Sequence, residues 1–413
     1  MPSRRNFLRN TSLGWLGFSS LPGKPSQLPS LSDFAHLSDE NELFKLVRQS
    51  LLVPKNRIYL NTGSLGPSPR QIVNRISELH MELEQNPVGN NWGNLGAQMD
   101  KVRQKVAAFI GASEEEIVLT RNTTDGLNLV GSCLALEPGD EILTTTHEHG
   151  GGENGLHFLT ETCGATLRKV EIPFPAQNTR EVVEAISKEI NDRTRVVLIS
   201  HVSTITGLRL PFAELAKITK PRKILLIADG AQAPGQIPID VGTLGVDVYA
   251  SSSHKWLMGP KETGFVYLRK EIQDQIRPVF THSNYKPYSA STGTRNVVNF
   301  IAMGETLDWH RALGREKIEH HCLKLANYCA ERLTNMEGLQ VISPTSPELQ
   351  TGIVSILLDD SFDNRALFEA LGKKEIIVKL LPKYNALRFS CHMFNTEADI
   401  DRMVSQLEVE MKG

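Results

Sequence analysis

The sequence predicts an α/β protein built around a mostly parallel, seven-stranded sheet, followed by a smaller α+β domain at the C-terminal end. The chain has 413 residues, more than one hydrophobic core usually supports, so two domains are expected. From about residue 98, helical segments alternate with short apolar strands, which is typical of a sheet with helices on both faces. Polar residues 281–294 end this alternation, and a long helical stretch follows.

The first structured segment is expected at 36–59 and is predicted to pack with the small domain. It contains a short amphipathic helix at 42–52 and a strand at 57–60. The strand runs into the turn-rich sequence Asn61-Thr62-Gly63-Ser64-Leu65-Gly66-Pro67. A helix is expected to restart near Pro69, because proline suits the first turn of a helix.

The large domain is predicted to span 60–285 and the connecting helix with the small domain 286–413. Periodicity predicts helices in the large domain at 98–110, 124–134, 180–190 and 211–218. Its seven strands are predicted at 117–120, 141–145, 166–172, 195–200, 224–228, 246–251 and 264–268. The C-terminal part is predicted to hold a long helical stretch at 299–335, strands near 354–357 and 386–390, and a final helix from residue 396.

Composition argues against several classes of protein. Lys and Arg number 45 against 47 Asp and Glu, so the chain lacks the basic excess that nucleic-acid binding needs. The 5 cysteines form no Cys-x-x-Cys pair, which argues against a disulfide framework or a zinc site. No apolar run reaches the roughly 18 residues of a membrane-spanning helix.

The N-terminus resembles a twin-arginine export signal. Ser3-Arg4-Arg5-Asn6-Phe7-Leu8-Arg9 is followed by a modestly apolar stretch at 11–21 and a Pro- and Ser-rich linker. Residues 1–35 are therefore interpreted as signal and linker, and a periplasmic location is expected. The alternative is a disordered basic tail on a cytoplasmic enzyme.

A lysine and an aspartate carry the chemistry. Lys255 lies in Ser251-Ser252-Ser253-His254-Lys255-Trp256, just after a predicted strand, and Asp229 ends the preceding one. Ligands of open α/β sheets bind at these carboxyl ends. A lysine can hold an aldehyde cofactor as a Schiff base, and an upstream aspartate can pair with a protonated pyridine nitrogen. Together they predict pyridoxal 5'-phosphate. Considered separately, Lys255 would be interpreted as an ordinary surface lysine and Asp229 as a helix cap.

Two further motifs follow predicted strands. Asn122-Thr123-Thr124-Asp125-Gly126 opens a helix, where hydroxyl and backbone N–H groups can bind a phosphate; ordinary N-capping is the alternative. His147-Glu148-His149-Gly150-Gly151-Gly152 offers an imidazole that could lie on a pyridine ring. Its two histidines and glutamate also suggest a metal hydrolase, but the His-Glu-x-x-His helix is absent and three glycines predict a loop.

These residues resemble the class V branch of fold-type I pyridoxal-phosphate enzymes, which contains isopenicillin N epimerase-like proteins and cysteine desulfurases. The resemblance covers 57 to about 410. It implies the fold-type I transferase fold and a Schiff base at Lys255. It also implies that Asp229 pairs with the ring nitrogen, that Gln232 reaches the ring hydroxyl and that His149 stacks on the ring. The phosphate ligands that it implies are Thr124, Ser252 and His254, with Thr123 close by.

The resemblance extends to the substrate and to a partner subunit. The segment beginning at Asn61 looks like an entry segment near the substrate, and Arg388 matches an arginine that binds the α-carboxylate. Gly293-Thr294-Arg295-Asn296 resembles a loop that crosses a dimer interface and places a threonine, here Thr294, on the partner's phosphate. A homodimer is implied. Thr204 replaces an asparagine that many members place near the cofactor.

The reaction stays open at this stage. Cysteine desulfurases carry a persulfide-forming cysteine before the arginine, but 373–383 contains none, which argues against ordinary cysteine desulfuration. The sequence favours aminotransferase or epimerase chemistry on an amino acid or an amino-bearing peptide-like metabolite. A C–S lyase and a non-catalytic binding protein of the same fold are the alternatives. His147 and Tyr285 are candidates for a second acid.

Overall fold

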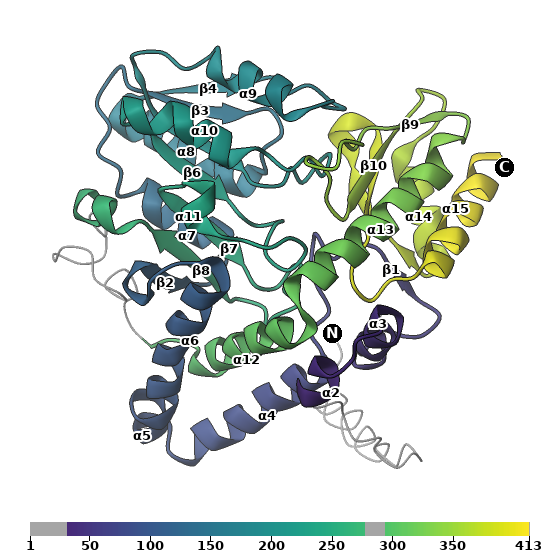
Figure 1. The fold of residues 1–413 in the computed structure, drawn as a ribbon, viewed down its shortest axis with the longest axis horizontal. Coiled ribbons are helices and arrows are strands. Elements are labelled where there is room, and N and C mark those ends of the chain that lie inside the picture. The colour runs from purple at the N-terminus through teal and green to yellow at the C-terminus, as the bar shows by residue number, and fades with distance from the viewer. Residues whose placement is uncertain (1–30, 277–293, 413) are drawn as a thin grey trace, which may run out of the picture.

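The computed structural model describes residues 31–276 and 294–412, which form three β-sheets (Figure 1). The export-like N-terminal segment and Tyr285 lie outside these described residues. Within the described ranges, no helix is both long and apolar enough to cross a membrane.

The large sheet has seven strands in the order β2-β8-β7-β6-β5-β3-β4. Neighbouring strands are parallel except that β8 runs antiparallel to both β2 and β7. The predicted fold class is thereby confirmed, and each of the seven predicted strands is present. Their bounds are β2 Ile117–Thr120, β3 Glu141–Thr145, β4 Thr166–Val170, β5 Thr194–Ser200, β6 Leu225–Asp229, β7 Val248–Ser252 and β8 Gly264–Leu268.

Helices cover both faces of this sheet. Side chains alternate along β5, so that Val197 and Ile199 join the core on one face while Val196 and Leu198 join the other. Burial on both faces explains why the central strands β5 and β6 contain consecutive apolar residues. One face packs against α6 (Asn94–Ile110), α9 (Thr179–Ser187), α10 (Phe212–Thr219) and α11 (Val241–Leu244), and the other against α7 (Thr123–Gly131) and α8 (Gly150–Cys163).

The predicted helical stretch at 299–335 is present and consists of two helices. They are α12 (Val297–Leu313) and α13 (Arg315–Thr334), separated by Gly314 with φ +88°. A non-glycine residue rarely adopts this backbone conformation, so Gly314 provides the bend. α12 packs on α6 and α4 (Arg70–Gln85), whereas α13 packs against the small domain.

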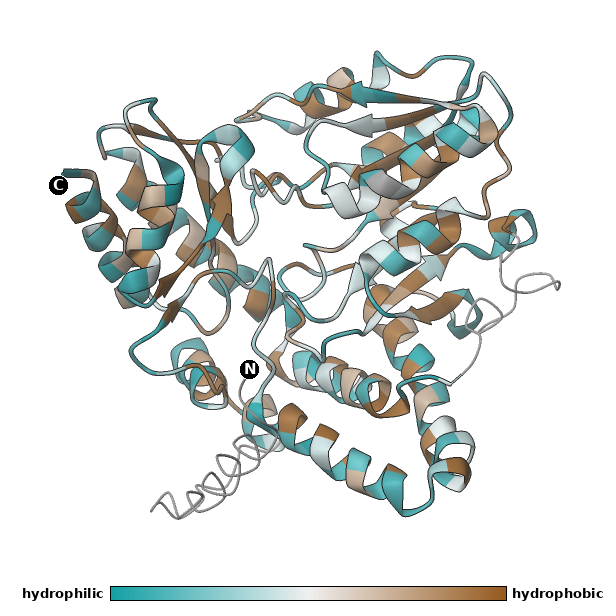
Figure 2. Cartoon of the chain, turned by 180° about the vertical axis from the view of Figure 1, so that it is seen from behind, coloured by the Kyte–Doolittle hydropathy of each residue, from teal (hydrophilic) through white to brown (hydrophobic). Residues whose placement is uncertain are grey.

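The small domain is a four-stranded antiparallel sheet with two helices on one side (Figure 1). Figure 2 shows its strands coloured mainly as hydrophobic residues, in keeping with the buried cluster beneath them. The sheet order is β12-β13-β10-β9, and the elements are β9 Leu339–Val341, β10 Ile353–Leu358, β12 Lys379–Leu381, β13 Ala386–Ser390, α14 Asn364–Lys373 and α15 Glu397–Lys412.

The N-terminal segment joins the two domains. β1 (Ile58–Tyr59) pairs in parallel with β11 (Ile376–Ile377) of the small domain. The loop that follows β1 then crosses to the large domain, where the Gly66 N–H donates to the carbonyl of His254 (2.7 Å). The remaining helices of this segment are α2 Leu31–Ala35, α3 Glu40–Gln49 and α5 Pro87–Trp92.

Gly66 allows this loop to approach the backbone that carries Lys255. A Cβ at position 66 would lie 2.1 Å from the Lys255 carbonyl oxygen, which is a backbone atom and cannot turn aside. We expect Gly66→Ala to lower the free energy of unfolding by about 2 kcal/mol or more, measured by chemical denaturation. Gly372→Ala is the matched control, because a Cβ there meets no atom within 4 Å and alanine favours a helix. Equal stabilities of the two variants would contradict the expectation.

Candidate active site

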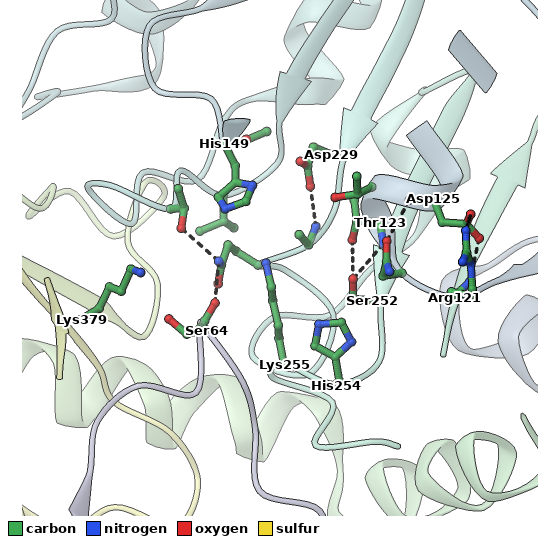
Figure 3. Close-up of a pocket in the computed structure, with 18 of the residues that line it drawn as sticks. Ser64, Arg121, Thr123, Asp125, His149, Asp229, Ser252, His254, Lys255 and Lys379 are labelled. Atoms are coloured by element: carbon green, nitrogen blue, oxygen red, sulfur yellow. Dashed lines mark hydrogen bonds and ion pairs between the residues drawn. The ribbon is translucent and has the colours of Figure 1, made fainter. Parts of the chain in front are cut away.

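A cavity of about 730 Å³ lies at the carboxyl ends of the central strands, between the large sheet, the loop after β1 and the small domain (Figure 3). Figure 3 shows Lys255 near its middle, with Asp229 and His149 above it and Lys379 and Arg121 at opposite ends. Ten of the residues singled out in the sequence line it: Thr123, Thr124, His149, Thr204, Asp229, Gln232, Ser252, His254, Lys255 and Arg388.

Asp229 and Lys255 are the central charged groups. Asp229 ends β6, and its Oδ1 accepts a hydrogen bond from the Ala231 N–H (2.9 Å). Burial raises the pKa of Asp229, although the positive charge of Lys255 opposes this shift. Burial also lowers the pKa of Lys255 to about 8, against the attraction of Asp229. The amine therefore has a substantial neutral fraction near neutral pH, as a nucleophile or base needs.

The N-terminus of α7 forms one end of the cavity. The Ser252 hydroxyl bonds both the N–H and the hydroxyl of Thr123 (2.8 and 2.7 Å), which ties α7 to the end of β7. Burial lowers the pKa of His254 to about 4, with Lys255 adding to the effect, and its buried Nδ1 has no hydrogen-bond partner among the described residues. Open donors at a helix N-terminus suit an anion such as phosphate.

The prediction that residues 150–152 form a loop was wrong, because these glycines begin helix α8. His149 caps the helix, since its Nδ1 accepts from the Gly151 N–H (3.1 Å). A Cβ at Gly151 would lie 2.6 Å from the Thr124 hydroxyl. Gly151 is thus required by the close approach of two helix N-termini, whereas a Cβ at Gly150 would meet no atom within 4 Å. The imidazole of His149 faces the cavity opposite Lys255 (Figure 3), and burial lowers its pKa.

Glu148 is a functional candidate that the sequence analysis considered only as a metal ligand. Its carboxylate accepts from the hydroxyls of Thr145 and Ser200 (2.5 Å each). Burial raises its pKa to about 7, and the negative charge of Asp229 adds to this. Ser200 lines the cavity, so Glu148 lies one residue behind the wall. In the described ranges, no group of three His, Cys, Asp or Glu residues is arranged to hold a metal ion.

Arg388 is buried at the other end of the cavity and is held by three residues from two loops. Its Nη1 donates to the carbonyl (2.9 Å) and the hydroxyl (2.6 Å) of Thr204, and its Nη2 donates to Ser64 (3.2 Å) and Asn61 (3.4 Å). Burial lowers the pKa of Arg388 to about 10, and its buried Nε has no described partner. Asn61 therefore acts on the site through Arg388.

Gln232 has its amide occupied by the protein. Its Nε2 donates to the Gly63 carbonyl (2.8 Å) and the Thr204 hydroxyl (3.1 Å), and its Oε1 accepts from the Trp256 indole (2.8 Å). In this arrangement Gln232 holds the entry loop and Thr204 in place. The contact with a ring hydroxyl that the resemblance implies for Gln232 stays a prediction.

Two residues singled out in the sequence, His147 and Thr294, lie outside this cavity. His147 is buried next to Phe174 (ring centroids 5.4 Å apart), its pKa is lowered to about 4 by burial, and it does not line the cavity. The structure thus removes His147 as a candidate second acid. Thr294 lines a separate cavity with Arg121 and Asp125.

Three further residues line the main cavity and were not predicted from the sequence: Ser64, Ser200 and Lys379. Only Ser64 lay within a motif that could have indicated it.

Comparison with known proteins identifies the family. The family model "Aminotransferase class-V" matches residues 58–403. Isopenicillin N epimerase from Streptomyces clavuligerus is 29% identical over 384 residues, which cover 87% of this chain and 96% of that protein. A probable cysteine desulfurase from Halalkalibacterium halodurans is 29% identical over 382 residues, which cover 85% of this chain and 92% of that protein.

Solved structures share the fold. The apo cysteine desulfurase of Thermococcus onnurineus NA1 superimposes with a TM-score of 0.79 at 25% identity, covering 89% of this chain and 98% of that one. A variant of C-DES, with glycine covalently linked to its pyridoxal-phosphate cofactor, gives a TM-score of 0.81 at 23% identity, covering 87% and 98%.

The fold and the lysine-aspartate site define a fold-type I pyridoxal-phosphate transferase. The chain belongs to the class-V aminotransferase family, whose members are pyridoxal-phosphate-dependent enzymes. The family and the cofactor inferred from the sequence are both confirmed.

The raised pKa of Glu148 makes stability depend on pH. The folded protein holds this proton up to about pH 7, whereas an unfolded glutamate loses it near pH 4.5. The contribution of protonated Glu148 to stability is therefore complete below about pH 4.5 and is lost as the pH rises from about 4.5 to about 7. Relative to Glu148→Gln, we expect the unfolding free energy of the unaltered protein to fall by up to about 3 kcal/mol between pH 5 and pH 8, at about 1.4 kcal/mol per pKa unit, in denaturant titrations.

Glu161→Gln, at an exposed position on α8, is the control and should follow the unaltered protein at every pH. A constant difference between Glu148→Gln and the unaltered protein across this range would contradict the expectation.

Proposed function

We propose that the protein is a pyridoxal-phosphate-dependent enzyme that acts on an amino acid or an amino-bearing peptide-like metabolite by transamination or epimerisation. The observation that carries this proposal is the arrangement in one cavity of a lysine with a pKa of about 8, a buried aspartate and a buried arginine. The similarity to isopenicillin N epimerases supports the epimerase alternative.

The residues present fit the cofactor. The unpartnered Nδ1 of His254 and the exposed Thr124 at the N-terminus of α7 suit its phosphate. Asp229 has one oxygen held by Ala231 and no described hydrogen bond to the other, which leaves an acceptor for a protonated ring nitrogen. Lys255 would hold the aldehyde covalently. When bound, pyridoxal phosphate supplies an electron sink for bonds at the substrate's α-carbon.

The chain itself supplies binding and proton transfer. Arg388 would bind the substrate carboxylate, and its side chain is already held in place by Thr204, Asn61 and Ser64, so little conformational freedom is lost on binding. The Lys255 amine removes the α-proton, because its lowered pKa of about 8 provides neutral amine near neutral pH. Asp229 holds the proton on the ring nitrogen throughout.

C–S lyase chemistry is the second candidate, since the same proton transfer precedes loss of a β-substituent. C-DES, which shares this fold, is a cystine C–S lyase. Desulfuration of cysteine itself is disfavoured because no cysteine is among the residues lining the described cavity. A non-catalytic binding protein would have no need for the lowered pKa of Lys255.

We further propose a homodimer in which Thr294 completes the phosphate site of the partner subunit. Two observations support this. Thr294 is exposed and lines a cavity outside the main one, so within one chain it contributes nothing to the phosphate end. Large apolar side chains are also exposed on α4 and α5: Met81, Val88 and Trp92.

The role of Lys255 can be tested by absorbance and turnover. We expect Lys255→Ala to lose the visible absorbance of lysine-bound cofactor and at least about 10²-fold in turnover. Asp229→Asn should keep that absorbance but lose about 10²-fold in turnover, because the ring nitrogen loses its charged partner. Lys270→Ala, at an exposed lysine outside the cavity, is the control. The proposal would be refuted if Lys255→Ala kept both the visible absorbance of the cofactor and the turnover of the unaltered enzyme.

The reaction is then assigned with holoenzyme, D- and L-amino acids and small peptides in deuterated water. Keto acid reports transamination, α-deuterium incorporation with inversion reports epimerisation, and sulfide reports C–S cleavage. Absence of all three products, with normal cofactor absorbance, would favour the non-catalytic binding protein.

The crossing of Thr294 can be tested by subunit complementation. Thr294→Ala should weaken phosphate-dependent cofactor binding, and Lys255→Ala should abolish the lysine-bound absorbance. In a mixed dimer of the two variants, one site would have both Lys255 and a partner Thr294, so its cofactor affinity should return. A monomeric mass by light scattering, or no recovery on mixing, would refute the proposal.

A further inference from the structure

The end of the cavity that holds Arg388 carries two positive charges. Arg388 is buried on β13, and Lys379 lies on the neighbouring strand β12 near the solvent. The two residues are direct partners in the antiparallel register, so their side chains leave the sheet on the same face. Figure 3 shows the Lys379 side chain pointing from this end toward the centre of the cavity.

No described acidic group compensates these charges. Arg388 bonds only carbonyl, hydroxyl and amide oxygens, and no carboxylate raises the pKa of either residue. Of the two acids in the cavity lining, Asp125 pairs with Arg121 at the opposite end (2.7 Å) and Asp229 faces Lys255 (Figure 3).

Adjacent like charges destabilise a strand pair. Burial lowers the pKa of Lys379, and the positive charge of Arg388 adds to this effect. A neutral residue at position 379 would avoid this repulsion. Because a lysine occupies this position in the cavity wall, an anion brought by the ligand is the group that would balance its charge. One carboxylate at Arg388 would still leave Lys379 unbalanced.

We propose that Lys379 binds a second anionic group of the substrate, so that the preferred substrates are amino acids or peptide-like amines with a further carboxylate besides the one at Arg388. This inference rests on the proposed function and specifies its substrate class. Arg388 lies deep and Lys379 at the rim, so the second carboxylate belongs to the part of the substrate that extends toward solvent.

The test compares acidic substrates with neutral isosteres. Holoenzyme is titrated with L-aspartate against L-asparagine and with L-glutamate against L-glutamine, and likewise with the D-forms. The dissociation constant is read from the change in cofactor absorbance. We expect the acidic member of at least one pair to bind about fivefold more tightly, the factor for a partly exposed ion pair, and the preference to shrink as salt is added.

Three variants assign the preference to Lys379. Lys379→Met should remove it by weakening the acidic member alone, and Lys379→Arg should keep it. Lys373→Met is the matched control, because this exposed lysine at the end of α14 does not line the cavity. The Lys373→Met variant should show the same preference for the acidic ligand as the unaltered enzyme.

Equal binding of acidic and neutral members in every pair would overturn the inference. So would a preference that survives Lys379→Met, or a loss in Lys379→Met that is equal for both members, which would place Lys379 on the α-carboxylate. Failure of the proposed function looks different, because the enzyme would then lack lysine-bound absorbance or give no response to any amino acid.

Discussion

The parallel register of β5, β6 and β7 is the constraint on which the site depends. It places Ser200 opposite Asp229 and Asp229 opposite Ala250, two residues before Ser252. Both faces of these strands are buried, so a shift by one residue would move apolar side chains to the wrong core. The cores on the two faces thereby fix where Asp229 and the Lys255 loop emerge, to a precision that the loops alone would not provide.

The charges of Lys255 and Asp229 at this edge of the sheet only partly neutralise each other, which keeps both groups reactive. Burial lowers the pKa of Lys255 and raises that of Asp229, and their mutual attraction only partly offsets both shifts. The polar groups around them are satisfied mainly by one another, as in the contact of Ser252 with Thr123 and of Thr204 with Arg388. A rigid polar frame therefore surrounds a few reactive atoms that are left open for a ligand.

Local patterns predicted the strands and the two central residues, because both depend on nearby sequence. Apolar runs mark the seven strands, and Asp229 and Lys255 follow two of them directly. Features that depend on distant contacts escaped prediction. The glycines at 150–152 read as a loop, since the proximity of Thr124 is not visible in sequence. Likewise, the engagement of Gln232 by Trp256 and Gly63 joins segments far apart in the chain.

The cations at the Arg388 end also link substrate binding to proton transfer. Arg388 and Lys379 both lower the pKa of Lys255 across the cavity. A carboxylate bound at Arg388 screens the first charge, and an anion at Lys379 screens the second. Each therefore raises the pKa of the Lys255 amine back toward that of an ordinary lysine, which makes the neutral amine a stronger base but lowers the neutral fraction near neutral pH. Lys379 thus keeps more of the Lys255 amine neutral before an anion binds, and a substrate with two carboxylates exchanges part of that neutral fraction for basicity.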